Sequence, residues 1–380
     1  MKNRAGDYKK NLKGDLSYPS FLPMRLPPDP GILFDEEMLV LLGQASNSLG
    51  VLEGISRQIP NTDLFVSMYV RKEALLSSQI EGTQATLDDI LDPNIESNTN
   101  QNVADVINYI KASQYASKRL RDLPLCNRLL KETHAILVEG MRGGDKSPGE
   151  FRRSQNWIGP AGGSLKDDRF IPPSPEDMEE AMSALEQFIN TDNLMDPLIK
   201  IALIHYQFET IHPFLDGNGR IGRLLVTLFL ATEKILNSST LYISYFLKKN
   251  RIEYYDRLTE VRTKGNFEQW IKFFLLAVSE SAQDAIQTIQ ALNNLHNQNE
   301  DAIKTLGKAS KNNLKLLNYL EVHPIMDISG ASSLLQLSFN TISKSVNYLI
   351  GLGIVIETTN SRRSRIFAYE SYLKIMRKDT

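Results

Sequence analysis

Apolar residues recur three and four positions apart over most of the first 280 residues. This spacing predicts amphipathic helices. Six segments carry it: Glu36–Ile55, Leu64–Ile80, Val103–Ser117, Cys126–Gly140, Pro175–Thr191 and Pro197–Glu209. Residues 1–35 contain five prolines, which exclude a helix and predict an extended arm packed on the body. The pattern therefore predicts a mainly helical protein.

Two intervals depart from this helical spacing. Arg152–Pro173 contains Trp157, the glycine-rich sequence GPAGG and a closing PPSP, so we expect a turn-bearing loop or hairpin there. Ser279–Lys311 is polar and rich in Gln, Asn and Ala, which is typical of a connecting helix or linker.

The last seventy residues resemble a separate module. They are expected to form a helix, a short helix, a turn, a second helix, a strand, a polar arginine loop and a strand: Asn312–Glu321, Ala331–Leu335, Leu337–Ser338, Asn340–Ile350, GLGIVIE, NSRRSR and IFAYE. This is the order of a winged helix-turn-helix. From residue 304 to the end there are 11 Lys or Arg against 5 Asp or Glu, so the module is basic.

The winged-helix interpretation assigns a face that could contact nucleic acid. Its recognition helix would expose polar side chains and its wing arginines: Asn340, Thr341, Ser343, Lys344 and Asn347, with Arg362, Arg363 and Arg365. Such residues suit phosphate and groove contacts. Winged helices also dock proteins or dimerise, so DNA is one of two possible partners.

Composition indicates the compartment and the kinds of partner that the protein is expected to have. The formal net charge is −2, so any basic site is local. Cys126 is the only cysteine, which excludes an intrachain disulfide and fits a reducing compartment. The amino terminus lacks the apolar run of a secretion signal, and apolar stretches such as Leu224–Ala231 are too short to span a bilayer. We therefore expect a cytoplasmic protein without a membrane partner.

The central segment HPFLDGNGRIGR concentrates groups that suit phosphate chemistry. Gly217, Asn218 and Gly219 can bring backbone N–H groups close to an anion, at the start of a helix that begins near Ile221. Arg220 and Arg223 lie three apart in the first turns of this helix, where their guanidinium groups could converge on a polyphosphate.

A metal ligand and a base lie just before the glycines. Asp216 offers the hard oxygen that Mg²⁺ prefers, and His212 could take a proton from an attacking hydroxyl. Taken singly, each residue has an ordinary structural explanation, but their combination within twelve residues favours a site. His205 lies seven residues before His212 and is interpreted as core packing, because no carboxylate or cysteine completes a metal site.

Residues 212–223 resemble the signature of the Fic family, His-X-Phe-X-Asp/Glu-Gly-Asn-Gly-Arg-X-X-Arg, at every defined position. The resemblance implies a Fic helical bundle that transfers AMP from ATP to a Ser, Thr or Tyr hydroxyl of a protein. It makes His212 the base and Asp216 the Mg²⁺ ligand. The phosphates and nucleotide would be held by the residues that follow: Gly217, Asn218, Gly219, Arg220, Ile221, Gly222 and Arg223. Relatives that phosphorylate carry lysine where this chain keeps Gly219, which favours AMP transfer.

An upstream segment resembles the inhibitory motif of the same family. Ser77, Glu81 and Gly82 match Ser/Thr-X-X-X-Glu-Gly/Asn, whose glutamate pairs with the second motif arginine, here Arg223. A carboxylate there would compete with the ATP γ-phosphate for one cation. Some relatives use this glutamate to remove AMP, and the sequence leaves that alternative open for Glu81.

Further positions are assigned by the resemblance alone. The loop Arg152–Pro173 resembles the family's β-hairpin flap, whose strand edge would dock the target protein by main-chain hydrogen bonds. Trp157, Ile158 and Gly159 would cover the nucleotide, although ordinary core filling explains Trp157 equally well. Tyr254 would contact adenine, but Arg262 stands where some relatives carry asparagine, which weakens that assignment.

The sequence is thus divided into four parts. They are an arm and helical region with the inhibitory motif, a Fic catalytic domain, a connecting helix or linker, and a winged helix: residues 1–110, 111–280, 281–311 and 312–380. A homodimer is possible. The rival hypothesis for the whole chain is a DNA-binding regulator whose central domain only senses nucleotide.

Overall fold

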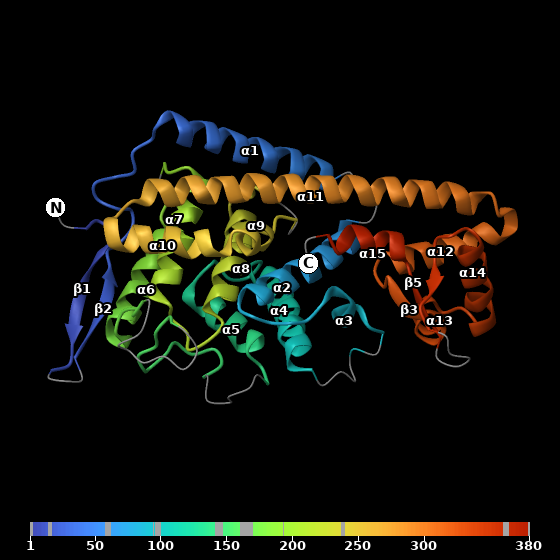
Figure 1. The fold of residues 1–380 in the computed structure, drawn as a ribbon, viewed down its shortest axis with the longest axis horizontal. Helices are drawn as coiled ribbons and strands as arrows, with labels where there is room; N and C mark the ends of the chain where they lie inside the picture. The colour runs from blue at the N-terminus through green and yellow to red at the C-terminus, as the bar shows by residue number, and fades with distance from the viewer. Residues whose placement is uncertain are drawn as a thin grey trace.

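The structure of the chain is a computed structural model that describes residues 3–13, 17–57, 62–93, 95, 100–140, 147–159, 170–192, 194–236, 240–359 and 365–378, with the backbone alone for residues 62–65. Helices make up most of the molecule and strands are few, as the sequence predicts (Figure 1). The wing residues Arg362 and Arg363 lie outside the described residues.

The amino-terminal arm is a hairpin. Strands β1 (Gly6–Asn11) and β2 (Tyr18–Pro23) pair antiparallel, with Gly6 opposite Pro23. The arm is therefore extended, as expected, but its strands form a two-stranded sheet that the sequence analysis did not predict.

Eleven described helices build the body and its extension: α1 (Glu36–Ser56), α2 (Thr62–Ile80), α3 (Leu87–Leu91), α4 (Gln101–Arg119), α5 (Asn127–Leu137), α6 (Pro175–Asn190), α7 (Pro197–Ile211), α8 (Asn218–Thr232), α9 (Ser244–Lys249), α10 (Arg251–Lys264) and α11 (Phe267–Lys304). The six predicted helices correspond to α1, α2, α4, α5, α6 and α7, and their ends differ by a few residues. Only the short α3 between them was not foreseen.

Local signals start these helices where the structure has them. The Asp35 side chain accepts a hydrogen bond from the Met38 N–H and caps α1. Asp196 caps α7 in the same way, and Pro197 follows at the first helical position, where its missing N–H costs nothing. Every residue of α7 after Pro197 is buried, so α7 is the central helix against which α8 packs.

The long helix α11 connects the body to the carboxy-terminal elements. It is continuous over 38 residues and runs the length of the molecule (Figure 1). The polar stretch predicted as a connecting helix or linker is therefore a helix that begins already at Phe267. The boundaries predicted at residues 110 and 280 fall inside α4 and α11.

The carboxy-terminal elements follow the predicted order, with additions. They are η3 (Gly307–Ala309), α12 (Ser310–Leu320), β3 (Ile325–Asp327), α13 (Ile328–Leu335), α14 (Phe339–Gly351), β4 (Ile356–Glu357), β5 (Ile366–Ala368) and α15 (Glu370–Met376). The three strands form one antiparallel sheet with β5 in the middle. Neither β3 nor α15 was predicted. The chain returns to the body after α15, where Arg377 binds Asp88 of α3 through two bonds of 2.9 and 3.0 Å.

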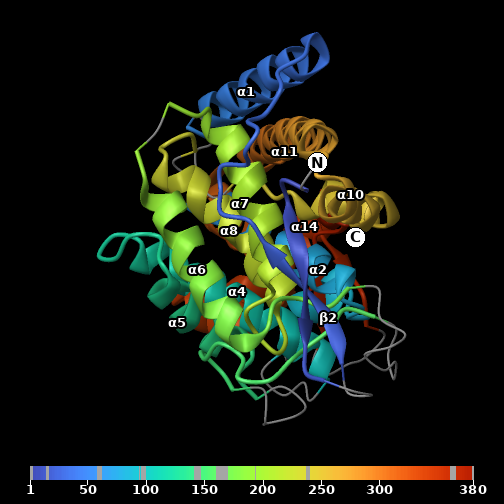
Figure 2. The same ribbon diagram turned by 90° about the vertical axis from the view of Figure 1, so that its left-hand side faces the viewer.

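Helix α1 lies on the outside of the molecule, packed along α11 (Figure 2). By length and composition alone it could cross a membrane, a property that the sequence analysis did not single out. A core helix passes the same test. In α1, however, only 28% of its 18-residue apolar stretch is buried inside the protein.

Candidate functional site

The turn between α7 and α8, residues His212–Gly217, is the centre of the candidate site, and we call it the motif turn. His212 ends α7 in the left-handed region, with φ 52° and ψ 60°. Gly217 begins α8 with φ 77°. A left-handed backbone is uncommon for residues other than glycine and requires support from its surroundings.

Buried side chains supply that support. The Asn218 side chain accepts from the Phe214 N–H and donates to the Phe214 carbonyl, both at 2.8 Å, and Asn156 donates to the same carbonyl at 2.9 Å. Arg152 is 1% exposed and donates from Nε to the His212 carbonyl at 3.0 Å. The Asn218 side chain is therefore committed to the turn, so Asn218 can serve an anion only through its backbone N–H.

His134 of α5 is a further support that the sequence analysis missed. Its Nε2 donates to the Asp216 carbonyl at 3.0 Å, and its Nδ1 accepts from the Gly149 N–H at 3.1 Å. The ring stacks on Phe214 with centroids 3.8 Å apart. Burial lowers the pKa of His134 to about 4, so the neutral ring keeps both hydrogen bonds at pH 7.

The start of α8 offers backbone N–H groups to an anion. The first bond within the helix runs from the Ile221 N–H to the Gly217 carbonyl at 3.0 Å, so the preceding amides have no partner inside the helix. Ile221 itself is 1% exposed. Gly222 faces α7, because its carbonyl binds His205 Nδ1 at 2.9 Å and a Cβ there would collide with Glu209. The side chain of Ile221 and the α-carbon of Gly222 are thus packed inside the protein, and the nucleotide contacts predicted for these two residues remain predictions.

The two motif arginines have different partners instead of converging. Arg220 Nη2 lies 3.6 Å from Asp216 Oδ1. Arg223 turns toward α2, where its Nε donates to Ser77 Oγ at 2.8 Å and its Nη2 to Glu81 Oε1 at 2.7 Å. A second bond from Nη2 reaches the Ser77 carbonyl at 2.9 Å. The expected meeting of the upstream segment, residues 77–82, with Arg223 is present.

The Glu81 carboxylate also lies against the start of α8. A Cβ on Gly219 would collide with Glu81 Oε1, so this oxygen lies against the start of α8. Gly82 follows with φ 101°, which suits glycine at the end of α2. Burial acts to lower the pKa of Arg223, but the adjacent Glu81 outweighs it and the pKa is raised. Arg223 is thus a fixed cation whose charge is already neutralised.

His212 is suited to act as a base. The residue is partly exposed beside the turn, while its Nδ1 is buried and has no hydrogen-bond partner among the described residues. Burial of the ring and the nearby positive charge of Arg152 lower its pKa to about 4. The imidazole is therefore neutral at pH 7 and able to accept a proton.

Two buried carboxyl groups near Arg223 were not foreseen from the sequence. Glu73 of α2 binds Ser244, and its Oε1 lies 3.4 Å from the Tyr109 hydroxyl. Glu209 of α7 lies beside Gly222. Burial raises the pKa of both carboxyl groups to about 7, although Arg223 opposes the shift. Nothing in their local sequence distinguishes them from ordinary helical glutamates.

Tyr254, the residue predicted to contact adenine, is buried, and that contact remains a prediction. Tyr254 is 1% exposed, and its hydroxyl binds His205 Nε2 at 3.0 Å. His205 is fully buried, as the core-packing interpretation expects, and burial lowers its pKa to about 4. Arg262 is also buried, 3.8 Å from the Phe170 ring centroid. The adjacent Tyr255 is the partly exposed aromatic ring at this end of α10.

The predicted flap is described at its two ends, and residues 160–169 lie outside the described residues. Ile158 and Phe170 form an antiparallel bridge with bonds of 2.9 and 3.1 Å. Phe21 of β2 adds a bond to the Ile171 carbonyl at 2.9 Å, so the amino-terminal hairpin extends this edge. Trp157 is 43% exposed, so core filling does not explain it. Gly159 is exposed beside it.

Asp216 is the residue that could hold a metal ion. Its side chain is 32% exposed and its Oδ1 accepts from the Gly217 N–H at 2.6 Å. Among the described residues there is no group of three or more His, Cys, Asp or Glu side chains placed to hold a metal. One carboxylate together with phosphate oxygens is nevertheless a usual Mg²⁺ environment, so Asp216 fits a metal that arrives with a nucleotide.

The carboxy-terminal face predicted for nucleic acid is accessible in part. On α14, Asn340, Lys344 and Asn347 are exposed, and Thr341 and Ser343 are partly exposed. Arg365 pairs with Glu357 across β4 and β5, its Nε 2.8 Å from Glu357 Oε1, so its charge is compensated.

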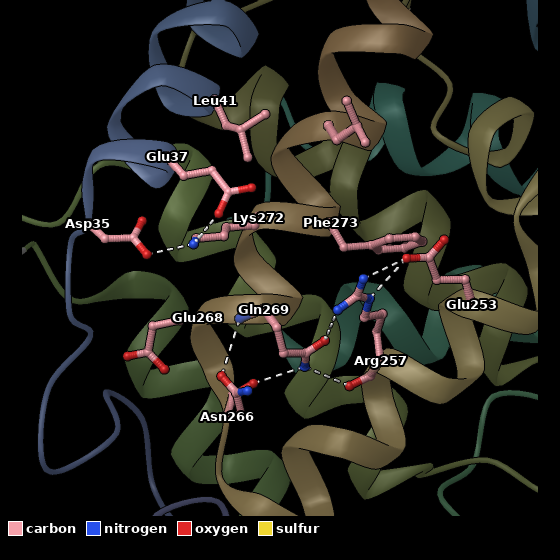
Figure 3. Close-up of a pocket in the computed structure, with 11 residues that line it drawn as sticks. Asp35, Glu37, Leu41, Glu253, Arg257, Asn266, Glu268, Gln269, Lys272 and Phe273 are labelled. Atoms are coloured by element: carbon pink, nitrogen blue, oxygen red, sulfur yellow. Dashed lines mark hydrogen bonds and ion pairs between the residues drawn. The ribbon is translucent and has the colours of Figure 1, made fainter.

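A surface hollow of about 500 Å³ lies apart from the motif, between the starts of α1 and α11 and helix α10 (Figure 3). Its charged groups are paired: Lys272 binds Asp35 at 2.6 Å and also Glu37, and Arg257 binds Glu253 at 2.7 Å. It contains none of the predicted site residues.

Comparison with known families agrees with this fold and motif. Residues 39–118 match the Fic/DOC family N-terminal region, and residues 124–230 match the Fic/DOC family. The chain therefore contains both regions of this family.

Known relatives and structures extend the comparison. The chain is 34% identical over 131 residues to the protein adenylyltransferase Fic of Culex quinquefasciatus, covering 33% of this chain and 22% of that protein. It is 29% identical over 204 residues to that of Drosophila virilis, covering 50% and 37%. The chain thus spans less than half the length of these curated relatives.

Two solved structures share the fold. A Fic family protein from Desulfovibrio desulfuricans G20 has a TM-score of 0.57 at 19% identity, covering 89% of this chain and 97% of that one. A Fic domain containing signaling protein from Bacteroides thetaiotaomicron has a TM-score of 0.50 at 19% identity, covering 67% and 97%.

Proposed function

We propose that this chain is a protein adenylyltransferase that transfers AMP from ATP to a Ser, Thr or Tyr hydroxyl of a target protein or of itself. The support is the motif turn beside the start of α8, together with relatives that carry this name over the matched region. The proposal concerns the whole activity, because the match covers only part of those relatives.

Each group at the candidate site has its own role in the proposed reaction. Backbone N–H groups at the start of α8 and the guanidinium groups of Arg220 and Arg223 hold the phosphates of ATP. A Mg²⁺ ion bound at Asp216 would neutralise phosphate charge when present. His212 takes the proton from the target hydroxyl as its oxygen bonds to the α-phosphorus. The bond from the α-phosphorus to the bridging oxygen breaks, and pyrophosphate leaves.

We also propose that the protein is autoinhibited. The observation that carries this step is the 2.7 Å ion pair between Glu81 and Arg223. While it persists, Arg223 is neutralised and a carboxylate lies where an anionic phosphate must approach. Loss of the pair frees the cation without changing the motif turn.

Two partners complete the proposal. The target docks on the strand edge near Ile158, where main-chain hydrogen bonds would position a hydroxyl with little demand on sequence. The carboxy-terminal module binds DNA through Asn340, Lys344 and Asn347. We place the protein in the cytoplasm.

The test is intact-mass analysis of the purified protein after incubation with ATP and Mg²⁺, together with candidate target proteins. We expect Glu81→Gly to raise the yield of AMP-modified protein by about 30-fold over wild type, since losing a charge-assisted hydrogen bond releases about 2 kcal/mol of inhibition. The Glu81→Gly, His212→Ala double variant should lose the added AMP mass.

The outcomes separate the parts of the proposal. Equal modification by the double variant would remove His212 as the base. Equal activity of wild type and Glu81→Gly would remove the inhibitory role of Glu81. If Glu81→Gly binds ATP but modifies neither itself nor any supplied target, the nucleotide-sensing regulator becomes the better explanation.

A further inference from the structure

Helix α15 joins the carboxy-terminal module to the body of the protein. Its residues Tyr372, Leu373 and Met376 are buried, and the helix packs along α11 (Figure 1). One residue, Tyr369, separates α15 from strand β5, and the Tyr369 N–H donates to the Pro324 carbonyl at 2.8 Å. Helix α15 is therefore attached to the sheet of the module at its start and to the body along its length.

The residue that follows α15 binds the helix after the upstream segment. Nε and Nη2 of Arg377 donate to the two oxygens of Asp88 at 2.9 and 3.0 Å, and Nη1 donates to Glu370 at 2.6 Å. A bidentate pair fixes the direction of approach as well as the distance. Asp88 lies in the first turn of α3, where Thr86 and Asp89 form a capping box. Arg377 therefore holds the ordered start of α3.

A short, hydrogen-bonded connection ties α3 to Glu81. The Thr83 N–H donates to the Ser78 carbonyl at 3.2 Å, and the Gln79 side chain donates to the Ala85 carbonyl at 3.0 Å. Both bonds bridge from the last turn of α2 to the residues that lead into α3. A displacement of α3 is therefore transmitted to the Glu81 carboxylate.

A second contact reaches α2 before the upstream segment. Asp284 of α11 is 5% exposed, and two lysines approach it from different elements. Lys378 Nζ lies 3.5 Å from Oδ1, and Lys72 Nζ of α2 lies 3.8 Å from Oδ2. The Tyr69 hydroxyl of α2 is also 3.4 Å from Oδ2. Because a buried carboxylate requires cations or donors around it, Lys378 and α2 compensate the same buried charge.

We propose that Arg377 and Lys378, which we call the carboxy-terminal clamp, hold the upstream segment in place so that Glu81 stays paired with Arg223. The inference rests on the proposed adenylyltransferase function and adds the regulation of its site. Glu81 lies between the two clamp contacts along the chain, so opening the clamp lets the end of α2 and α3 move away from α8. A ligand of the carboxy-terminal module that shifts α15 would then raise AMP transfer.

Intact-mass measurement of AMP transfer by the full chain tests the clamp. Arg377→Met should raise the yield of modified protein about fivefold over wild type, as expected for a partly exposed ion pair. Asp88→Asn should have the same effect, and the double variant should exceed neither single variant, because both changes remove one interaction. Arg119→Met is the matched control: this arginine side chain is 27% exposed against 32% for Arg377, and it binds Glu132 at 3.1 Å. It should transfer AMP as wild type does.

The Glu81→Gly background separates the clamp from the proposed function. Glu81→Gly already lacks the inhibitory carboxylate, so adding Arg377→Met should leave its AMP transfer unchanged. A further rise in this background would overturn the clamp, and so would equal transfer by wild type and Arg377→Met while Glu81→Gly is active. If Glu81→Gly transfers no AMP to itself or to supplied targets, the proposed function fails instead.

Hydrogen exchange followed by mass spectrometry tests the clamp without any activity. Arg377→Met should speed amide exchange in peptides covering residues 77–88, because these residues lose a contact that holds them closed. Peptides covering α7 and the motif turn should exchange as in wild type, and Arg119→Met should leave residues 77–88 unchanged. Unchanged exchange of residues 77–88 in Arg377→Met would overturn the proposal. An equal increase over the whole chain would also overturn it, because it would show a general loss of stability.

Discussion

The motif turn and the upstream segment meet at Arg223, but the protein holds them in contrasting ways. The supports of the motif turn are buried, with His134 at 0%, Arg152 at 1% and Asn218 at 2% exposed. The carboxylate that reaches Arg223 belongs to a Glu81 side chain that is 36% exposed. One part is fixed by many buried bonds, and the other depends on a bond at the surface.

This difference suits a switch. Groups that must meet a reacting phosphate gain from a geometry that does not change, because preorganised dipoles need no rearrangement during the reaction. An inhibitor must leave, and the Glu81 side chain, which is 36% exposed, can be rehydrated when it separates from Arg223.

The largest effect is expected when the motif turn loses its buried arginine. Arg152→Met leaves the carbonyls of His212, Pro173 and Ser154 without this donor. We expect the free energy of unfolding to fall by about 4 kcal/mol, roughly 1 for each carbonyl plus the loss of buried packing. Urea unfolding followed by circular dichroism measures it. Arg121→Met, at an exposed position, is the control, and an equal loss in both variants would contradict the role of Arg152.

Glu73 lies on α2, the helix that leads to Glu81, and its burial should make the stability of the protein depend on pH. Glu73 is 2% exposed and its pKa is raised to about 7 by burial. A raised carboxyl pKa means that its contribution to stability is complete below the ordinary pKa and is lost as the pH rises through 7. Glu73→Gln, which resembles the protonated acid, should therefore be more stable than wild type at pH 8 by at most ~3 kcal/mol and equal to it at pH 4.5.

Thermal unfolding between pH 4.5 and 8 checks this prediction. Part of the pH dependence should persist in Glu73→Gln, because the buried Glu209 titrates in the same range. Glu179→Gln, on the exposed side of α6, should behave as wild type. If Glu73→Gln is less stable than wild type at pH 8, the ionised Glu73 stabilises the folded protein, its pKa is not raised by burial and the argument fails.

The same contrast explains what the sequence could predict. The motif is contiguous, so residues 212–223 suffice to place a base, an anion site and two cations together, and the family pattern adds Glu81. The supports lie far away in the sequence: His134 and Arg152 reach the motif turn only because α5 and the loop after it pack beside α7 and α8. Neither has a local pattern that distinguishes it.

The amino-terminal hairpin was missed for a different reason. Proline excludes a helix and the middle of a sheet, but it is tolerated in an edge strand. Both strands of a two-stranded sheet are edges, and β2 contains Pro19 and Pro23. Proline in residues 1–35 therefore allowed a hairpin, although an extended arm was the simpler expectation.

The smallest effect is expected at Ser77, which holds the inhibited position of Arg223 from the side. Its Oγ accepts from Arg223 Nε at 2.8 Å, while the Ser77 carbonyl accepts separately from Nη2. Ser77→Ala removes the first bond and leaves the second and the Glu81 pair, so about 1 kcal/mol of inhibition is lost. AMP transfer measured by intact mass should rise about fivefold, well below the effect of Glu81→Gly.

Ser78→Ala is the matched control: this neighbour is equally buried, and its hydroxyl has no hydrogen-bond partner among the residues that the structure describes. Equal activity in the two serine variants would show that Glu81 alone holds Arg223 and that the side contact adds nothing to the inhibition.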